Sequence, residues 1–326
     1  MVSRVLEKSK LSTSSVKLPD QPPTASLAVT LGRLKLKNPV MVASGTFGFG
    51  SEYADLVDLN RLGAIVVKAV TLKPRVGNPM PRMVETAAGC LNAIGLQNPG
   101  LDAFLTEKLP YLRQFDCPVI VNIAADRAEE FSALAERLSE AEGVAALEMN
   151  ISCPNQATGG IEFGVDPKMT EMVVKSVRGK TDLPLIVKLS PNVTDITVIA
   201  RAAVSGGADI LSLVNTFVGT AINAKTRKFR LANRTGGLSG PAIKPLALYM
   251  VWRVANAVPV PIIGMGGIMT ATDAIEFLLA GAGAVAIGTA NFVNPTASLQ
   301  AIDGIREYLQ EYGFHSVTEI IGKVSS

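Results

Sequence analysis

Short runs of apolar, largely β-branched residues recur along the chain from Val40 onward, with amphipathic stretches between them. In order, the runs are PVMVAS, GAIVVK, PVIVNI, AALEMN, PLIVKL, DILSLV, VPIIGM and GAVAIG. Their apolar residues are continuous and do not alternate with polar ones, which is typical of strands in a parallel sheet that is covered on both faces. The pattern therefore predicts eight buried parallel strands.

The stretches between the runs carry apolar residues three and four positions apart, as at 128–143, 169–181 and 270–283. This spacing predicts crossover helices. Eight strand and helix units without a linker indicate an α/β fold of the (β/α)8 TIM barrel type, and a doubly wound open sheet is the weaker alternative. Two long insertions, 70–101 and 217–241, are expected to be loops at the carboxyl ends of the second and sixth strands.

A single domain is expected over residues 27–326, because barrels of this type occupy about 250 residues or more as one unit. Residues 1–26 are rich in Ser, Lys and Pro and lack a signal peptide's apolar core, so they are expected to form a disordered N-terminal extension.

Charge and cysteine content exclude several classes of function. Lys and Arg number 31 against 28 Asp and Glu, a net charge of +3 that does not indicate nucleic-acid binding. The chain has no uncharged apolar run long enough to span a bilayer, so we expect a cytoplasmic protein that does not bind membranes. Its three cysteines are too far apart for a disulfide framework, a metal site or an iron-sulfur cluster.

Polar residues directly follow most of the predicted strands, where the carboxyl ends of barrel strands carry the chemistry. For any single position, a buried polar group with a purely structural role explains the residue equally well, but six positions together indicate a site. Lysine and asparagine in such a site suit an anionic ligand with several C=O and N–H groups. The residues are Ser44, Lys68, Asn122, Asn150, Lys188 and Asn215 with Thr216.

Glycines follow the seventh and eighth strands, at Gly266, Gly267 and Gly288 with Thr289. Barrels commonly build a phosphate site at this place from backbone N–H groups, although tight turns alone also explain such glycines. A GxGxxG fingerprint after the first strand is absent, so a mononucleotide fits better than a bound dinucleotide.

Two residues are candidates for acid-base work. The single histidine, His315, lies beyond the eighth strand, and we expect it to be a surface or packing residue. Cys153 follows the fourth strand at the start of a glycine-rich loop. A free thiol titrates near pH 8.5 and accepts a proton as its thiolate, yet an inert core cysteine is an equally good interpretation of the position alone.

Several long motifs resemble one enzyme family. The segments NISCPN, LNAIGLQNPG, TLKPRVGNPMPR, GGLSGPAIKP, GMGGI and AVAIGTANF are similar to those of the catalytic subunit of class 1B dihydroorotate dehydrogenase, from about Leu27 to the C-terminus. The resemblance implies FMN-dependent oxidation of (S)-dihydroorotate to orotate in pyrimidine biosynthesis. In that reaction a proton leaves C5 to a base, here Cys153, and a hydride passes from C6 to flavin N5.

The resemblance also implies two sets of binding residues. Those for FMN are Ser44, Lys68, Ala69, Asn122, Asn150, Lys188, Val214, Gly240, Gly266, Gly267, Gly288 and Thr289. Those for dihydroorotate are Lys68, Asn92, Ala93, Ile94, Gly95, Leu96, Asn150, Asn155, Asn215 and Thr216.

A partner is implied as well, because class 1B enzymes pass electrons to NAD through a separate subunit that carries FAD and a [2Fe-2S] cluster. The expected assembly is a homodimer of this chain within a heterotetramer. The alternatives are the fumarate-dependent class 1A enzyme, a flavin-dependent dihydrouridine synthase acting on RNA, and a non-catalytic barrel that serves as a scaffold.

Overall fold

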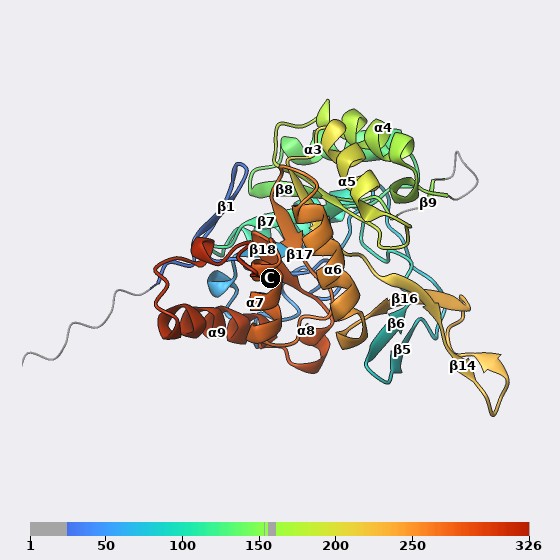
Figure 1. Cartoon of the computed structure of the whole chain (residues 1–326). Helices are drawn as coiled ribbons and strands as arrows, with labels where there is room; N and C mark the ends of the chain where they lie inside the picture. Colours follow the sequence, from blue (N-terminus) through green and yellow to red (C-terminus); the bar gives the residue numbers. More distant parts are fainter. Residues whose placement is uncertain (1–24, 153, 156–160, 326) are drawn as a thin grey trace, which may run out of the picture.

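The computed structural model describes residues 25–152, 154–155 and 161–325, so most of the predicted extension lies outside the described residues. Eight parallel strands close into a barrel in the order β11-β12-β17-β18-β3-β4-β7-β8 (Figure 1). This closure confirms the predicted TIM barrel and excludes the open sheet. The strands are β3 (Val40–Val42), β4 (Ala64–Val66), β7 (Val119–Ile123), β8 (Val144–Asn150), β11 (Leu185–Lys188), β12 (Ile210–Leu213), β17 (Ile262–Gly264) and β18 (Ala284–Ile287).

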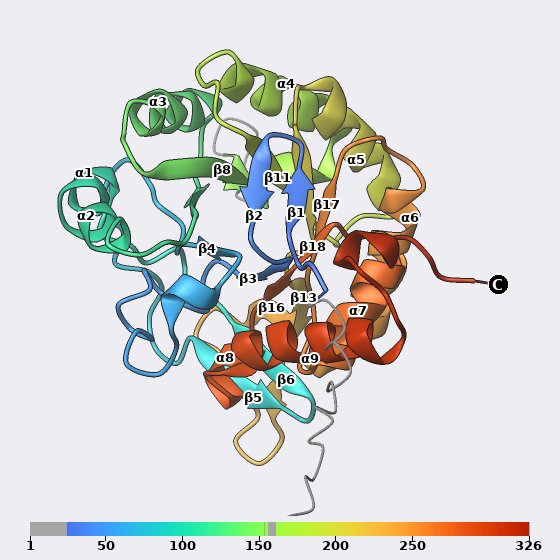
Figure 2. The same ribbon diagram turned by 90° about the vertical axis from the view of Figure 1, so that its left-hand side faces the viewer.

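Helices surround the barrel, as the views in Figures 1 and 2 show. The longer ones are α3 (Ala128–Ser139), α4 (Pro167–Arg178), α5 (Ile196–Ser205), α6 (Lys244–Ala255), α7 (Ala271–Leu279) and α9 (Ala297–Glu311). Shorter helical segments are α1 (Leu101–Ala103), a π-helical turn (Phe104–Lys108), α2 (Leu109–Leu112) and α8 (Ala290–Val293). Single 3-10 turns cover Leu59–Arg61, Phe163–Val165, Pro241–Ile243 and Val317–Glu319.

Helix starts follow local capping chemistry. Asp166 and Asp195 precede α4 and α5, and their carboxylates accept hydrogen bonds from backbone N–H groups of the first turn. At α7, Thr270 and Asp273 cap each other's backbone in a capping box. These residues fix where each crossover helix begins, and so the length of the loop that precedes it.

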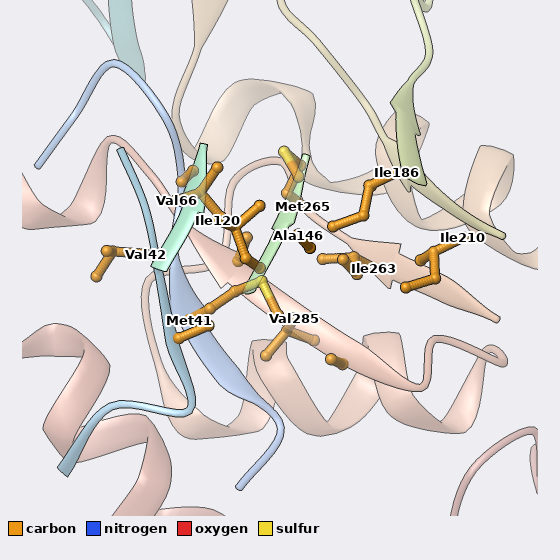
Figure 3. Packing of buried hydrophobic residues seen from close by; sticks show 14 of the residues in the cluster. Met41, Val42, Val66, Ile120, Ala146, Ile186, Ile210, Ile263, Met265 and Val285 are labelled. Carbon is orange, nitrogen blue, oxygen red and sulfur yellow. The ribbon is translucent and has the colours of Figure 1, made fainter. Parts of the chain in front are cut away.

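Apolar side chains fill the barrel interior (Figure 3). Met41 of β3, Ile120 of β7, Ala146 of β8 and Val285 of β18 come from different strands and are inaccessible to solvent. The barrel is therefore a packed core with no open channel along these side chains.

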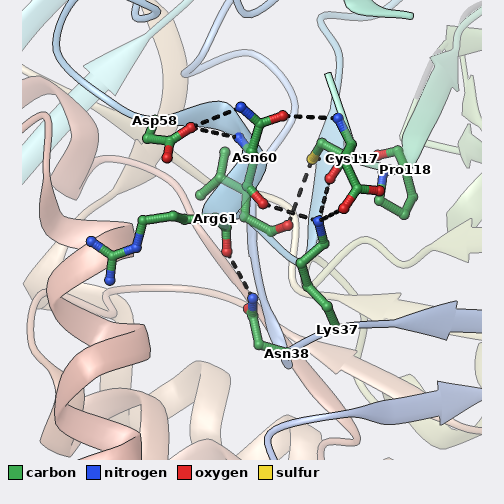
Figure 4. Close-up of polar contacts among 9 residues, drawn as sticks. Lys37, Asn38, Asp58, Asn60, Arg61, Cys117 and Pro118 are labelled. Atoms are coloured by element: carbon green, nitrogen blue, oxygen red, sulfur yellow. Dashed lines mark hydrogen bonds and ion pairs between the residues drawn. The ribbon is translucent and has the colours of Figure 1, made fainter. Parts of the chain in front are cut away.

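A hairpin of β1 (Val29–Leu31) and β2 (Leu34–Leu36) lies at the amino-terminal end of the barrel, with the side chain of Leu31 close to Gly283 just before β18. Polar contacts tie the loops together at the same end (Figure 4). The Nζ of Lys37 donates to the Asn60 carbonyl and to the Asp116 carboxylate, at 3.0 and 2.6 Å. These contacts precede the strands, where residues serve stability more than chemistry.

The two long insertions were expected to be loops, but they form a sheet together. Its four antiparallel strands run in the order β13-β16-β6-β5, with a small hairpin beside it and a short strand pair farther along the rim. The strands of the sheet are β5 (Met83–Thr86), β6 (Gly89–Asn92), β13 (Phe217–Thr220) and β16 (Thr235–Ser239). The hairpin is β14 (Ile222–Asn223) with β15 (Lys228–Phe229), and the pair is β9 (Pro154–Asn155) with β10 (Ile161–Glu162).

Candidate active site

A cavity of about 530 Å³ opens at the carboxyl ends of the barrel strands, beneath the sheet formed by the two insertions. Its size is that of a typical site for a small molecule or cofactor. Backbone and side chains from both the barrel and the insertions line it, so it is a composite of segments far apart in the sequence.

The cavity brings the sequence-predicted residues together. All predicted FMN positions line it, and so do the predicted substrate positions except Asn155. Asn155 lies in β9, and its side chain is outside what the structure describes. Cys153, the predicted base, also lies outside the described residues. The residues brought together are Ser44, Lys68, Ala69, Asn92, Ala93, Ile94, Gly95, Leu96, Asn122, Asn150, Lys188, Val214, Asn215, Thr216, Gly240, Gly266, Gly267, Gly288 and Thr289.

Two lysines give the cavity positive charge. Lys188 ends β11 with 7% of its surface exposed, and Lys68 follows β4 and is half-buried. Burial lowers the pKa of Lys68, the nearby positive charge of Arg82 lowers it further, and Glu52 partly opposes both effects. Within the described part of the chain, neither lysine forms an ion pair with a carboxylate. Both charges are therefore available to an anionic ligand.

Asparagine amides add uncharged polar groups to the cavity, with hydrogen-bond donors and acceptors side by side. The Nδ2 of Asn215 donates to Asn150 Oδ1 at 3.1 Å, and Asn215 Oδ1 accepts from the Thr216 N–H at 2.8 Å. The Nδ2 of Asn122 donates to the buried carboxylate of Glu148 at 2.6 Å. Asn122 Oδ1 is buried without a hydrogen-bond partner in the described structure, and such atoms usually mark a ligand or water site.

Glycines form one end of the cavity, and their backbone conformation requires glycine. Gly240, Gly266 and Gly267 have φ values of +98°, +128° and +76°. Tight packing is part of their role, since a Cβ on Gly267 would lie 2.8 Å from the Gly240 carbonyl oxygen. The backbone N–H groups of Gly267 and Gly288 donate to no acceptor among the described residues. This end of the cavity therefore combines tight turns with free N–H donors, which suit an anion.

The cysteine thiols differ in position. Cys90 lines the cavity, with its Sγ 3.3 Å from Ser239 Oγ. Cys117 is buried at the other end of the barrel, and burial raises the pKa of its thiol to about 12 (Figure 4). His315 is exposed and absent from the cavity lining, in line with the expectation of a surface or packing residue.

Sequence reasoning missed several lining residues. Gly45 and Thr46 directly follow Ser44, so extending each strand-end motif by two positions would have found them. Cys90, Ser239 and Phe292 had no such signal, because they enter the cavity only through the antiparallel sheet or the short helix α8.

No group of three or more His, Cys, Asp or Glu side chains in the described residues is arranged to hold a metal ion. Over the same residues, every helix is too short or too polar to cross a membrane.

Comparison with known proteins identifies close relatives. The family model described as dihydroorotate dehydrogenase matches residues 26–309. A protein of Geotalea uraniireducens (strain Rf4) is 58% identical over 296 residues, which cover 91% of this chain and 97% of the relative. Relatives from Desulforamulus reducens (strain ATCC BAA-1160 / DSM 100696 / MI-1) and Alkaliphilus oremlandii (strain OhILAs) are 58% and 55% identical over 91% and 92% of the chain and 98% and 99% of their own lengths. All three are named dihydroorotate dehydrogenase B (NAD(+)), catalytic subunit.

Proposed function

Because this chain belongs to the dihydroorotate dehydrogenase family, we propose that it binds FMN in the cavity at the carboxyl ends of the barrel strands and oxidises (S)-dihydroorotate to orotate there. It is an oxidoreductase of the NAD-linked, class 1B kind, and its reaction serves pyrimidine biosynthesis. The observation that carries the proposal is the convergence in one cavity of two lysines, several amides and glycine N–H groups. Among the described residues, the lysines have no carboxylate partner and the N–H groups of Gly267 and Gly288 have no acceptor.

The residues present fit FMN. The N–H groups of Gly267 and Gly288, which donate to no acceptor in the part of the chain that the structure describes, match the phosphate, which needs donors and a close backbone approach. The Oδ1 of Asn122, which has no partner among the described residues, matches a ring N–H, and the ammonium of Lys188 matches a ring that gains negative charge on reduction. FMN, when bound, would supply the acceptor for the hydride that leaves C6 of the substrate, and this hydride carries both electrons of the oxidation.

Side chains of this chain bind the substrate and accept its proton. Lys68 holds the substrate carboxylate, while Asn92, Asn150 and Asn215 pair with the ring's alternating N–H and C=O groups. Cys153, as the thiolate, accepts the proton from C5. Loss of this proton together with the C6 hydride leaves the C5=C6 double bond of orotate, so the reaction balances.

A partner subunit completes the electron path. The relatives are named as catalytic subunits of an NAD(+) enzyme, which supports a second chain in the assembly. FAD and a [2Fe-2S] cluster on that chain would carry the electrons to NAD. In this proposal the complex is a heterotetramer with a homodimer of this chain at its centre.

Flavin content and acceptor choice test the function. The purified chain should be yellow with one FMN per chain, and anaerobic dihydroorotate should bleach its absorbance near 450 nm while orotate, the matched control, should not. NAD should be reduced only after an iron-sulfur flavoprotein subunit is added. Rapid turnover of the lone chain with fumarate would reassign it to class 1A, and a colourless chain that cannot be loaded with FMN would refute the proposal.

A further inference from the structure

A buried acid lies next to the cavity without lining it. Glu148 of β8 has 1% of its surface exposed and is absent from the cavity lining. It forms no ion pair with a basic side chain in the described part of the chain. Burying an acid in a packed barrel is costly unless its oxygens are well hydrogen-bonded. We therefore expect Glu148 to have a role that an apolar side chain could not perform.

Both oxygens of this acid are engaged by polar hydrogens. Oε2 accepts from Asn122 Nδ2 at 2.6 Å, and Oε1 accepts from Ser212 Oγ at 2.7 Å. The sheet register explains the first contact, because Asn122 and Glu148 are paired across the parallel strands β7 and β8. Such neighbours have their side chains on the same face of the sheet, about 5 Å apart.

The contact decides which way the Asn122 amide points. A carboxylate only accepts hydrogen bonds, so the amide nitrogen must face Glu148 and the amide oxygen must face away from it. That oxygen, Oδ1, is the buried atom left without a partner in the described residues, on a side chain that lines the cavity. Free rotation of the amide would offer the cavity a donor half of the time.

We propose that Glu148 is a positioning residue that locks the Asn122 amide with its oxygen toward the cavity, so that Asn122 presents an acceptor to an N–H of the flavin ring. The inference rests on the proposed FMN-dependent function. Glu148 touches neither cofactor nor substrate and acts only through Asn122. Ser212 donates a hydrogen bond to the other carboxylate oxygen of Glu148. In the described structure, its side chain forms no hydrogen bond with the amide of Asn122.

Two nearly isosteric variants test the proposal by exchanging the donor and the acceptor of the hydrogen bond between Asn122 and Glu148. Asn122→Asp keeps an oxygen toward the cavity but sets a second carboxylate against Glu148. We expect the dissociation constant of FMN to rise roughly 10- to 100-fold, because a buried polar group loses its partner. Adding Glu148→Gln supplies a donor from the other side and should restore the constant to within about threefold. Ser212→Ala, the matched control, should change it by less than about threefold.

The outcomes separate this inference from the function it rests on. FMN is titrated into the deflavinated full chain by fluorescence quenching, and the reduction potential of the bound flavin is measured for each variant. Failure of Glu148→Gln to rescue Asn122→Asp, in a wild-type chain that binds FMN, overturns the positioning role alone. A wild-type chain that does not bind FMN overturns the proposed function and this inference with it.

A second set of variants tests the proposal even where Asn122→Asp folds poorly. If Glu148 acts through Asn122, Glu148→Leu weakens FMN binding in the wild-type background but not in the Asn122→Ala background. Equal effects of Glu148→Leu in both backgrounds would show that the acid acts on the fold generally and would overturn the proposal.

Discussion

Substitution of Gly267 distinguishes an effect on folding stability from an effect on cofactor binding at the cavity. Its φ of +76° lies in the left-handed region, which an alanine adopts at a cost of about 1–2 kcal/mol. A Cβ there would lie 2.8 Å from the Gly240 carbonyl oxygen and 2.9 Å from the Lys244 backbone nitrogen. These neighbours are backbone atoms that cannot rotate away, so overpacking adds about 1–3 kcal/mol.

We therefore expect Gly267→Ala to lower the free energy of unfolding by about 2–5 kcal/mol. For a chain of this size, each kcal/mol corresponds to roughly 2–4 °C, so Tm of the FMN-free protein should fall by about 4–20 °C. Differential scanning calorimetry of the deflavinated chain measures the change directly.

Gly288→Ala, directly after the neighbouring strand β18, is the matched control. Its φ lies outside the left-handed region, and a Cβ there would meet only Ala43 and Thr46 side-chain atoms at 3.6 Å and 3.8 Å, an ordinary contact distance. We expect its Tm without FMN to stay within about 2 °C of the wild type. Its Cβ would still enter the cavity, so FMN should bind it more weakly and raise its Tm by less. A Gly267→Ala chain as stable as Gly288→Ala without FMN would refute the reasoning.

Three further predictions concern charge and the thiols. Cys153→Ala should slow anaerobic bleaching of the flavin by dihydroorotate at least about 100-fold at neutral pH, while FMN content is retained; stopped-flow absorbance measures this, and an equally fast variant would sink the assignment of the base. Lys68→Met should raise KM for dihydroorotate roughly 10- to 100-fold. Because burial lowers the pKa of Lys68, substrate affinity of the wild type should fall as pH rises through that lowered value, whereas Lys68→Arg should show no such fall. Cys117, with its pKa raised to about 12 from 9.0, should resist iodoacetamide at pH 8 until the chain unfolds, as mass spectrometry of peptides would show. Since the folded pKa is above the unfolded one, its contribution should leave stability unchanged below pH 9.0 and reduce it between pH 9.0 and about 12, and Cys117→Ala should lack that loss.

The barrel was predictable because its strands carry their own signal. Apolar runs such as 119–121 and 185–187 are buried on both faces, so their continuous apolar character marks them in the sequence. The antiparallel sheet over the cavity was not predictable in this way. Its pairs, such as Leu91 with Leu238, join segments about 150 residues apart, and its strands are short and partly exposed. No local periodicity identifies the partner of such a strand.

The same difference applies to the candidate site. Lys68, Asn122 and Lys188 stand out because a polar residue at the end of an apolar run has few structural explanations, and the structure brings them to one cavity. Glu148 lies inside the apolar run 145–150, and no neighbouring residue in the sequence predicts a role for its carboxylate. Its partners become apparent only from the strand register and from Ser212, 64 residues farther along the chain.

Lysines at the two ends of the barrel differ in whether a carboxylate pairs with them, and this difference bears on which cysteine could serve as the base. At the amino-terminal end, the Lys37 ammonium is held by the Asp116 carboxylate and by backbone carbonyls (Figure 4). The thiol of Cys117 beside it has a raised pKa because burial outweighs the effect of that lysine.

At the carboxyl end, Lys68 and Lys188 have no carboxylate partner in the described part of the chain. A thiol becomes a useful base only where positive charge remains free to favour its thiolate. Lys188 is paired with Asn150 at the end of the fourth barrel strand, β8, and Cys153 comes three residues later in the sequence. Charge placement therefore favours a thiolate at the carboxyl end of the barrel, where the proposed base Cys153 follows β8 in the sequence, over one at the end that holds Cys117.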